Sequence, residues 1–141
     1  MIPDNVHMDS RLVIYYMGAA FVYLAIGTLL FAVIVSGAVK SDVDSVFVLW
    51  FFGFVVMMVF GLSYMFAPGF SHARYADYRI VASEFAVLNA GIIVFFSGGA
   101  LGINSIETAG ATLMLFGVLV HAYNMLYMLS GKGAIGKLQQ A

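Results

Sequence analysis

The sequence predicts an all-α integral membrane protein, a four-transmembrane-helix bundle in which successive helices run up-down-up-down within one membrane domain, residues 1–141. The chain has 63% hydrophobic and only 9% charged residues, whereas soluble domains have about 25% charged residues. Its apolar runs do not alternate and are about twice the ~10 residues of a barrel strand. Short loops between them favour antiparallel neighbours. The predicted spans are 12–39, 47–67, 80–98 and 108–129.

The first two spans differ in how they are bounded. The first is longer than a bilayer needs, so it is expected to tilt or extend past the interface, and Asp9 or Ser10 can cap its start. The second carries no charge and is expected to end at Pro68-Gly69. Trp50 lies near its start, where an indole can keep its N–H in water at the membrane interface.

The last two spans are separated by a polar stretch, GALGINSIET, which is expected to form a loop. Asn104, Ser105 and Glu107 provide its polar break and a cap for the fourth helix. Basic residues then set the orientation, because cytoplasmic loops are enriched in them. One side would hold Arg11, Arg74, Arg79, Lys132 and Lys137, and the other only Lys40. Both termini are therefore predicted to be cytoplasmic, in a cell membrane.

Composition excludes several classes of function. A net charge of -1 leaves no basic face for a nucleic acid, and the absence of cysteine excludes thiolate metal sites and cysteine nucleophiles. The sequence contains no nucleotide-binding or hydrolytic motif. We therefore predict no catalytic residue.

Ionisable residues inside a span are candidates for function because burying them in lipid is costly. His121 is roughly 12 Å from the cytoplasmic end of its helix, and Glu84 is roughly 6 Å deep, where it could snorkel to the surface. Asn89 matches the depth of His121, and the two are expected to hydrogen-bond. The depth of Glu84 is shared by Ser63, Tyr64, Tyr123 and Asn124. The prediction is two structural polar layers.

An alternative is that His121 ligates haem b or a metal, since neutral imidazole is the commonest metal ligand. A b-type cytochrome normally needs a second axial histidine, but His7 and His72 fall outside the predicted spans. Methionine could serve instead. Soft thioether ligands also suit copper(I), and the methionines close in sequence are Met57, Met58, Met125 and Met128. Methionine is more commonly a core filler, so we predict no cofactor.

Glycines recur along the spans at intervals of about two turns. Small residues allow helices to approach closely, within a bundle or against a partner. The glycines assigned to helix packing are Gly53, Gly61, Gly91 and Gly117, with Gly18, Gly27 and Gly110 in similar positions.

Three segments resemble small four-helix membrane proteins related to haem-copper oxidase subunit I. They are GFVVMMVFGLSYMFAPGF (53–70), ASEFAVLNAG (82–91) and LFGVLVHAYNML (115–126). In those relatives, histidines lie just before the glycine that opens the first segment and again next to its tyrosine, where they would hold haem or metal. Here Val46, Val48 and Met65 take those places. The resemblance therefore implies the bundle without the haem site.

The predicted function is a non-catalytic accessory subunit of a prokaryotic multisubunit membrane complex, a redox enzyme or metalloenzyme such as a copper membrane monooxygenase or respiratory oxidase. Its partners would be the lipid bilayer and other integral membrane subunits. One alternative is a b-type haem or metal protein that uses His121 for electron transfer or gas sensing. Another is a small-solute channel or transporter.

Overall fold

The computed structural model describes residues 6–38, 43–70 and 78–129, and all its regular elements are helices. They are α1 (Val6–Val35), α2 (Val43–Val48), the π-helix η1 (Leu49–Val56), α3 (Met57–Phe70), α4 (Tyr78–Leu101) and α5 (Asn104–Leu129). Since α2, η1 and α3 follow one another directly, these described residues form four helical segments that are long and apolar enough to cross a membrane. The predictions of an all-α fold and of four such segments are confirmed.

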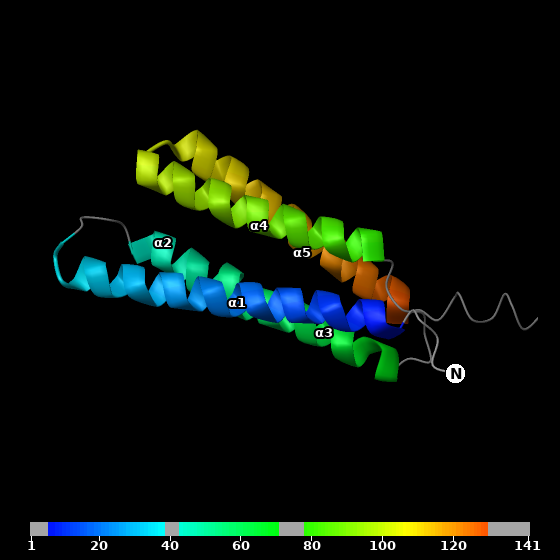
Figure 1. The fold of residues 1–141 in the computed structure, drawn as a ribbon. Helices are drawn as coiled ribbons and strands as arrows, with labels where there is room; N and C mark the ends of the chain where they lie inside the picture. Colours follow the sequence, from blue (N-terminus) through cyan, green and yellow to red (C-terminus); the bar gives the residue numbers. More distant parts are fainter. Residues whose placement is uncertain (1–5, 39–42, 71–77, 130–141) are drawn as a thin grey trace, which may run out of the picture.

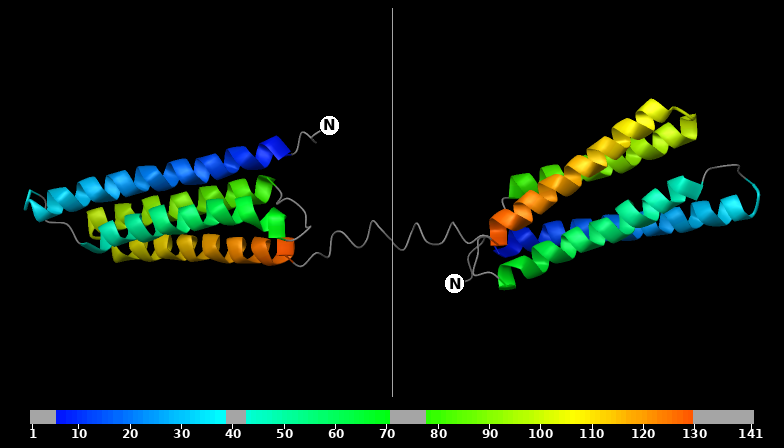
Figure 2. Two further views of the ribbon diagram at one scale, coloured as in Figure 1. Left: turned by 90° about the horizontal axis from the view of Figure 1, so that it is seen from below. Right: turned by 180° about the vertical axis from the view of Figure 1, so that it is seen from behind.

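The four segments form two helical hairpins (Figure 1). In one, α1 lies along η1 and α3; in the other, α4 packs on α5 over most of its length. The hairpins lie together at the end where α1 begins and diverge toward the α4–α5 connection, which the rear view also shows (Figure 2). Contacts between the hairpins nevertheless run along the molecule, from α1 with α4 and α3 with α5 at the first end to α2 with α4 at the other.

The connection between α4 and α5 is much shorter than predicted. Gly102 adopts a positive φ of 67°, and the Ile103 N–H bonds back to the Gly98 carbonyl at 2.9 Å, which is how a left-handed glycine commonly closes a helix. The stretch expected to be a loop is thus helical apart from Gly102 and Ile103. Glu107 lies in the first turn of α5.

Other helix ends also differ from the predicted ones. Because α1 begins at Val6, Asp9 and Ser10 lie inside it and do not cap it. It ends at Val35, before Gly37 with a φ of 75°, whereas the prediction ran to residue 39. The helix α3 continues past Pro68 to Phe70, because a proline in the last turn removes only one backbone hydrogen bond.

The π-helix η1 was not predicted from the sequence. It spans eight residues and includes Gly53. A Cβ added to Gly53 would lie 2.6 Å from the Cβ of Tyr23, so only a glycine lets η1 approach α1 this closely. Trp50 also faces α1, with its ring 5.3 Å from that of Phe31. Its Nε1 is buried and has no partner among the described residues, so the prediction that this N–H meets water is wrong.

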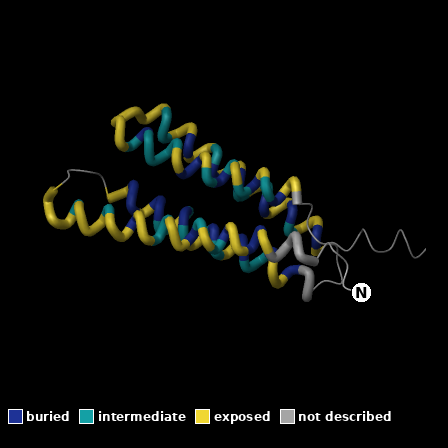
Figure 3. Tube along the Cα trace, viewed as in Figure 1, coloured by how far each residue is buried: buried dark blue, intermediate teal, exposed yellow. Residues whose placement is uncertain are grey.

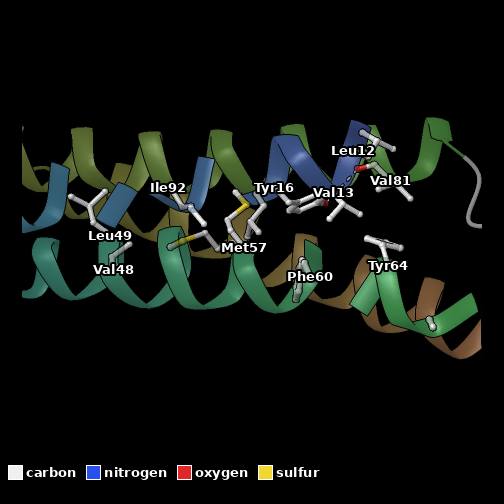
Figure 4. Packing of buried hydrophobic residues seen from close by; sticks show 14 of the residues in the cluster. Leu12, Val13, Tyr16, Val48, Leu49, Met57, Phe60, Tyr64, Val81 and Ile92 are labelled. Atoms are coloured by element: carbon white, nitrogen blue, oxygen red, sulfur yellow. Dashed lines mark hydrogen bonds between the residues drawn. The ribbon is translucent and has the colours of Figure 1, made fainter. Parts of the chain in front are cut away.

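Buried residues follow the inner faces of the helices, and exposed ones face outward (Figure 3). Figure 4 shows side chains from both hairpins in one core, among them Met57 of α3 and Ile92 of α4. The outer surface carries large apolar side chains, among them Leu29, Phe116 and Leu126. An apolar exterior of this kind suits lipid and is unfavourable in water, consistent with a multi-pass membrane protein.

The glycines assigned to packing fall into two groups. At Gly91, an added Cβ would lie 2.8 Å from the backbone nitrogen of Met114, and at Gly61 it would lie 3.0 Å from Tyr16. The α4–α5 contact therefore depends on Gly91 and the α1–α3 contact on Gly61, as the α1–η1 contact depends on Gly53. Gly117 has only ordinary contacts, at 3.4 Å and beyond, and Gly18 has open space.

Candidate functional site

Where the hairpins lie together, polar side chains from all four spanning segments form one buried network, which we call the polar cluster. It consists of Tyr16 from α1, Ser63 and Tyr64 from α3, Glu84 from α4, and His121 and Asn124 from α5. All are buried except Ser63, which is half-buried. The interior of the fold is apolar around it.

Glu84 is the centre of the cluster and is only 1% exposed. Its Oε1 accepts a hydrogen bond from the Tyr16 hydroxyl at 2.9 Å, and its Oε2 accepts one from Tyr64 at 2.5 Å. The prediction that it snorkels is wrong for two reasons. Glu84 lies roughly 9 Å along α4 from the start of the helix at Tyr78. It also shares the inner face of α4 with Val81 and Leu88.

His121 uses both ring nitrogens inside the cluster. Its Nδ1 lies 2.9 Å from Oε1 of Glu84, and its Nε2 lies 3.0 Å from Oγ of Ser63. The hydroxyl of Ser63 donates to the Phe60 carbonyl at 2.8 Å. The imidazole stacks on the Phe60 ring, with centroids 3.6 Å apart and planes 6° apart, and Tyr64 meets it edge-on. Polar contacts at both ring nitrogens and stacking on one ring face therefore fix the position of the imidazole.

Asn124 extends the network by one hydrogen bond. Its Nδ2 donates to the Tyr64 hydroxyl oxygen at 2.9 Å. The Tyr64 hydroxyl hydrogen is then available for the hydrogen bond to Glu84, so the Asn124 amide helps to orient the Tyr64 hydroxyl. Asn124, His121 and Gly117 lie on the buried stripe of α5 at helical spacing.

Asn89 does not belong to the cluster. Its Oδ1 accepts a hydrogen bond from the Tyr23 hydroxyl at 2.7 Å, and its Nδ2 donates to the Phe85 carbonyl at 2.7 Å. The predicted Asn89–His121 hydrogen bond is therefore wrong. Asn89 bonds to α1 instead of α5. His121 lies in one network with Glu84, Tyr64 and Asn124, which were predicted from the sequence to form a separate polar layer.

Sequence reasoning missed two of the three tyrosines of the first span, Tyr16 and Tyr23. Tyr16 and Tyr23 are seven residues apart, two helical turns, and so lie on one face of α1. Each bonds a polar side chain of α4. This spacing was the signal that could have found them.

The described residues do not fit a haem or metal group. They contain no group of three or more potential ligands among histidine, cysteine, aspartate and glutamate. A ligand bond from His121 Nε2 would have to displace Ser63. The histidine positions of the resembling proteins are filled by Val46 and Val48, which are buried, and by Met65, which is exposed. His72 and the side chain of His7 lie outside the described part.

The methionines considered for copper also have a structural explanation. Met57 and Met128 are buried in the apolar core, and Met58 and Met125 pack against it. Flexible thioethers commonly fill irregular gaps of this kind. The described structure therefore gives these side chains a packing role.

An apolar pocket of about 460 Å³ lies beside the cluster, between η1 and α3 on one side and α4 and α5 on the other. Phe60 connects the pocket with the polar cluster, because its side chain lines the pocket and stacks on His121. The rest of the lining is aliphatic or aromatic: Val48, Phe51, Phe52, Val56, Phe95, Ala111, Met114, Leu115 and Val118. This chemistry suits hydrocarbon and offers a polar ligand no partner.

No protein-family model, curated protein or solved structure matches the chain. The resemblance to relatives of haem-copper oxidase subunit I thus rests on the three sequence segments alone. Function has to be argued from the geometry of the site.

Proposed function

We propose that the chain is a non-catalytic accessory subunit of a multisubunit membrane complex, of the redox or metalloenzyme kind suggested by its resemblance. The observation that supports this most is that its buried polar side chains are used for its own fold. Among the described residues, the Trp50 indole nitrogen is the one buried side-chain nitrogen or oxygen without a hydrogen-bond partner. Apart from that indole N–H, no buried polar side chain in the described part of the chain is left over to hold a substrate.

The outer surface supports the same proposal. Exposed hydroxyl groups on it bond to backbone carbonyls of their own helices, as Thr28 does to Leu24 at 2.8 Å and Thr112 to Thr108 at 2.8 Å. The remaining surface is largely apolar, with small residues such as Gly18 and Ala90 exposed. Such surfaces suit close packing against lipid or the helices of another subunit.

The proposal includes a membrane orientation in which the positively charged side is cytoplasmic. Both termini and the loop that contains Arg74 would then lie inside a prokaryotic cell. Because the chain has no cysteine, single cysteines can report this without background. In intact cells, Ser105→Cys should react with a membrane-impermeant maleimide, and Ser71→Cys should react only after lysis. The reverse pattern would overturn the orientation.

The subunit proposal is tested by purifying the tagged chain from its native membrane in a mild detergent. We expect larger integral membrane proteins to copurify in fixed stoichiometry, with bound metal or a redox cofactor in the complex. A homogeneous particle that contains only this chain would overturn the proposal. Gly18→Trp is a useful companion variant because the residue has no neighbour within 4 Å. It would weaken a partner contact on α1 without disturbing the fold.

One observation favours the alternative that His121 binds haem or a metal. A histidine that ligates a metal usually donates its other N–H to a carboxylate, and Nδ1 of His121 lies 2.9 Å from Glu84. Opposing it, Nε2 lies against Ser63 and one ring face against Phe60. A Soret band in the purified protein that is lost in His121→Ala would support haem. A colourless protein free of iron and copper would exclude this alternative.

A further inference from the structure

The polar cluster brings together titratable groups from four helices. These are Tyr16 of α1, Tyr64 of α3, Glu84 of α4 and His121 of α5. Arg11 and Arg79 belong to α1 and α4 but lie on the exposed surface. At neutral pH tyrosine ordinarily stays protonated and uncharged, whereas glutamate is ordinarily ionised and histidine titrates close to that pH. The charge of the cluster is therefore decided by Glu84 and His121.

The surrounding hydrogen bonds restrict where protons lie. Since the Tyr64 oxygen accepts from Asn124, its own proton points to Glu84. Ser63 has one hydroxyl hydrogen, and that hydrogen points to the Phe60 carbonyl. Its oxygen is then an acceptor toward His121, so Nε2 of His121 carries a hydrogen at the 3.0 Å contact.

The remaining contact needs one more hydrogen. Nδ1 of His121 and Oε1 of Glu84 are 2.9 Å apart, a hydrogen-bond distance that requires a proton on one of the two atoms. On Nδ1 it gives an imidazolium beside a carboxylate, and on Oε1 it gives a neutral imidazole beside a carboxylic acid. Both placements leave the pair with no net charge.

The competing arrangement is a neutral imidazole protonated only at Nδ1 beside an ionised Glu84. Ser63 would then have to donate to Nε2 and give up the Phe60 carbonyl. The pair would also carry a net negative charge in a buried, apolar region, where an uncompensated charge is costly. Glu84 is only 1% exposed, so water cannot provide the compensation.

We propose that Glu84 and His121 bind one proton between them and form an uncharged proton-binding site inside the membrane-spanning part. This goes beyond the accessory role, which requires only packing. Loss of the proton would leave a negative charge in the cluster, and gain of a second would leave a positive one.

The experiment counts the proton without altering the cluster. Glu84 and Glu107 are the glutamates of the sequence, and His7, His72 and His121 are its histidines. The variant His7→Gln/His72→Gln/Glu107→Gln therefore keeps Glu84 and His121 as unique reporters. The full chain, with ¹³C-carboxyl glutamate and ¹⁵N-ring histidine, is placed in lipid nanodiscs and studied by solid-state NMR at neutral pH.

We expect Nε2 of His121 to be protonated, together with either a carboxylate and an imidazolium or a carboxylic acid and a neutral imidazole. A carboxylate beside a neutral imidazole would overturn the proposal, and so would a carboxylic acid beside an imidazolium. Adding Glu84→Gln to the same variant gives a second measurement, because glutamine cannot supply the negative charge. His121 should then be neutral at the same pH, and an imidazolium in this variant would contradict the proposal.

Discussion

Glu84 of α4 and His121 of α5, 37 residues apart in sequence, meet at 2.9 Å, and Tyr16 and Tyr64 bond the same carboxylate from the other hairpin. One side chain thus joins the two hairpins where they lie together. In lipid, helices gain little from burying apolar surface against each other, so polar links and close packing decide which helices meet. The polar cluster is therefore expected to contribute to both stability and specificity of the fold.

Replacing Glu84 with alanine should strongly destabilise the protein. Tyr16, Tyr64 and His121 would each lose a hydrogen-bond partner, and each unsatisfied buried polar group costs about 1–3 kcal/mol. We expect a loss of roughly 3 kcal/mol or more in the free energy of unfolding, measured by denaturant titration of the protein in detergent micelles.

The matched control is Ser83→Ala, on the adjacent residue of α4. Ser83 is exposed, and its hydroxyl bonds only the Ile80 carbonyl of its own helix at 2.8 Å. Its replacement should change the free energy of unfolding by no more than about 0.5 kcal/mol. Equal effects at the two positions would show that the carboxylate does not hold the hairpins together.

A pair of double-mutant cycles should distinguish the two hydrogen-bond networks. Tyr23→Phe and Asn89→Ala should be coupled by about 0.6 kcal/mol, the average for such bonds in membranes, because their side chains bond at 2.7 Å. Asn89→Ala and His121→Ala share no bond and should be additive. Coupling between Asn89 and His121, without coupling between Tyr23 and Asn89, would instead support the Asn89–His121 hydrogen bond predicted from the sequence.

The spans were predictable because they depend on length and composition. An uncharged run such as 47–67 has few alternatives in a protein this apolar. The boundaries were less predictable, because they depend on single residues whose effect is local. Gly102 was included in a polar stretch, whereas its left-handed backbone closes α4 and lets α5 begin two residues later. The π-helix at Leu49–Val56 has no marker in the sequence.

The candidate site was predicted in composition but not in its contacts. Glu84, His121, Asn124 and Tyr64 were selected because polar residues are costly in lipid, and they do meet. Depth alone could not decide their partners, since it ignores the direction in which a side chain leaves its helix. Tyr16 was missed because tyrosine is common in apolar spans and its hydroxyl gave no signal by itself.

Substitution of alanine at Gly110 should separate α4 from α5. An added Cβ would meet backbone atoms of Phe95, which cannot rotate away as a side chain can. Overpacking of this kind costs about 1–3 kcal/mol. Gly18→Ala is the control, because it enters open space and should stabilise α1 by about 0.5–1 kcal/mol through helix propensity. Thermal unfolding in detergent should move in opposite directions for the two variants, and a shared direction would refute the packing argument.

Trp50 should behave as a buried indole with an unsatisfied N–H. Its Nε1 has no partner among the described residues, and an unpaired buried donor costs about 1–3 kcal/mol. Trp50→Phe removes that donor and keeps most of the ring, so the free energy of unfolding should stay the same or rise. Trp50→Ala also removes the packing against Phe31 and should cost about 3–5 kcal/mol.

The same residue gives an optical test, because the chain has one tryptophan. If the indole is shielded as the structure shows, its emission should be blue-shifted and insensitive to iodide in the aqueous phase. An interfacial indole with its N–H in water would instead be quenched. Strong iodide quenching in nanodiscs, together with a large loss of stability in Trp50→Phe, would mean that the N–H is hydrated and that η1 lies differently against α1.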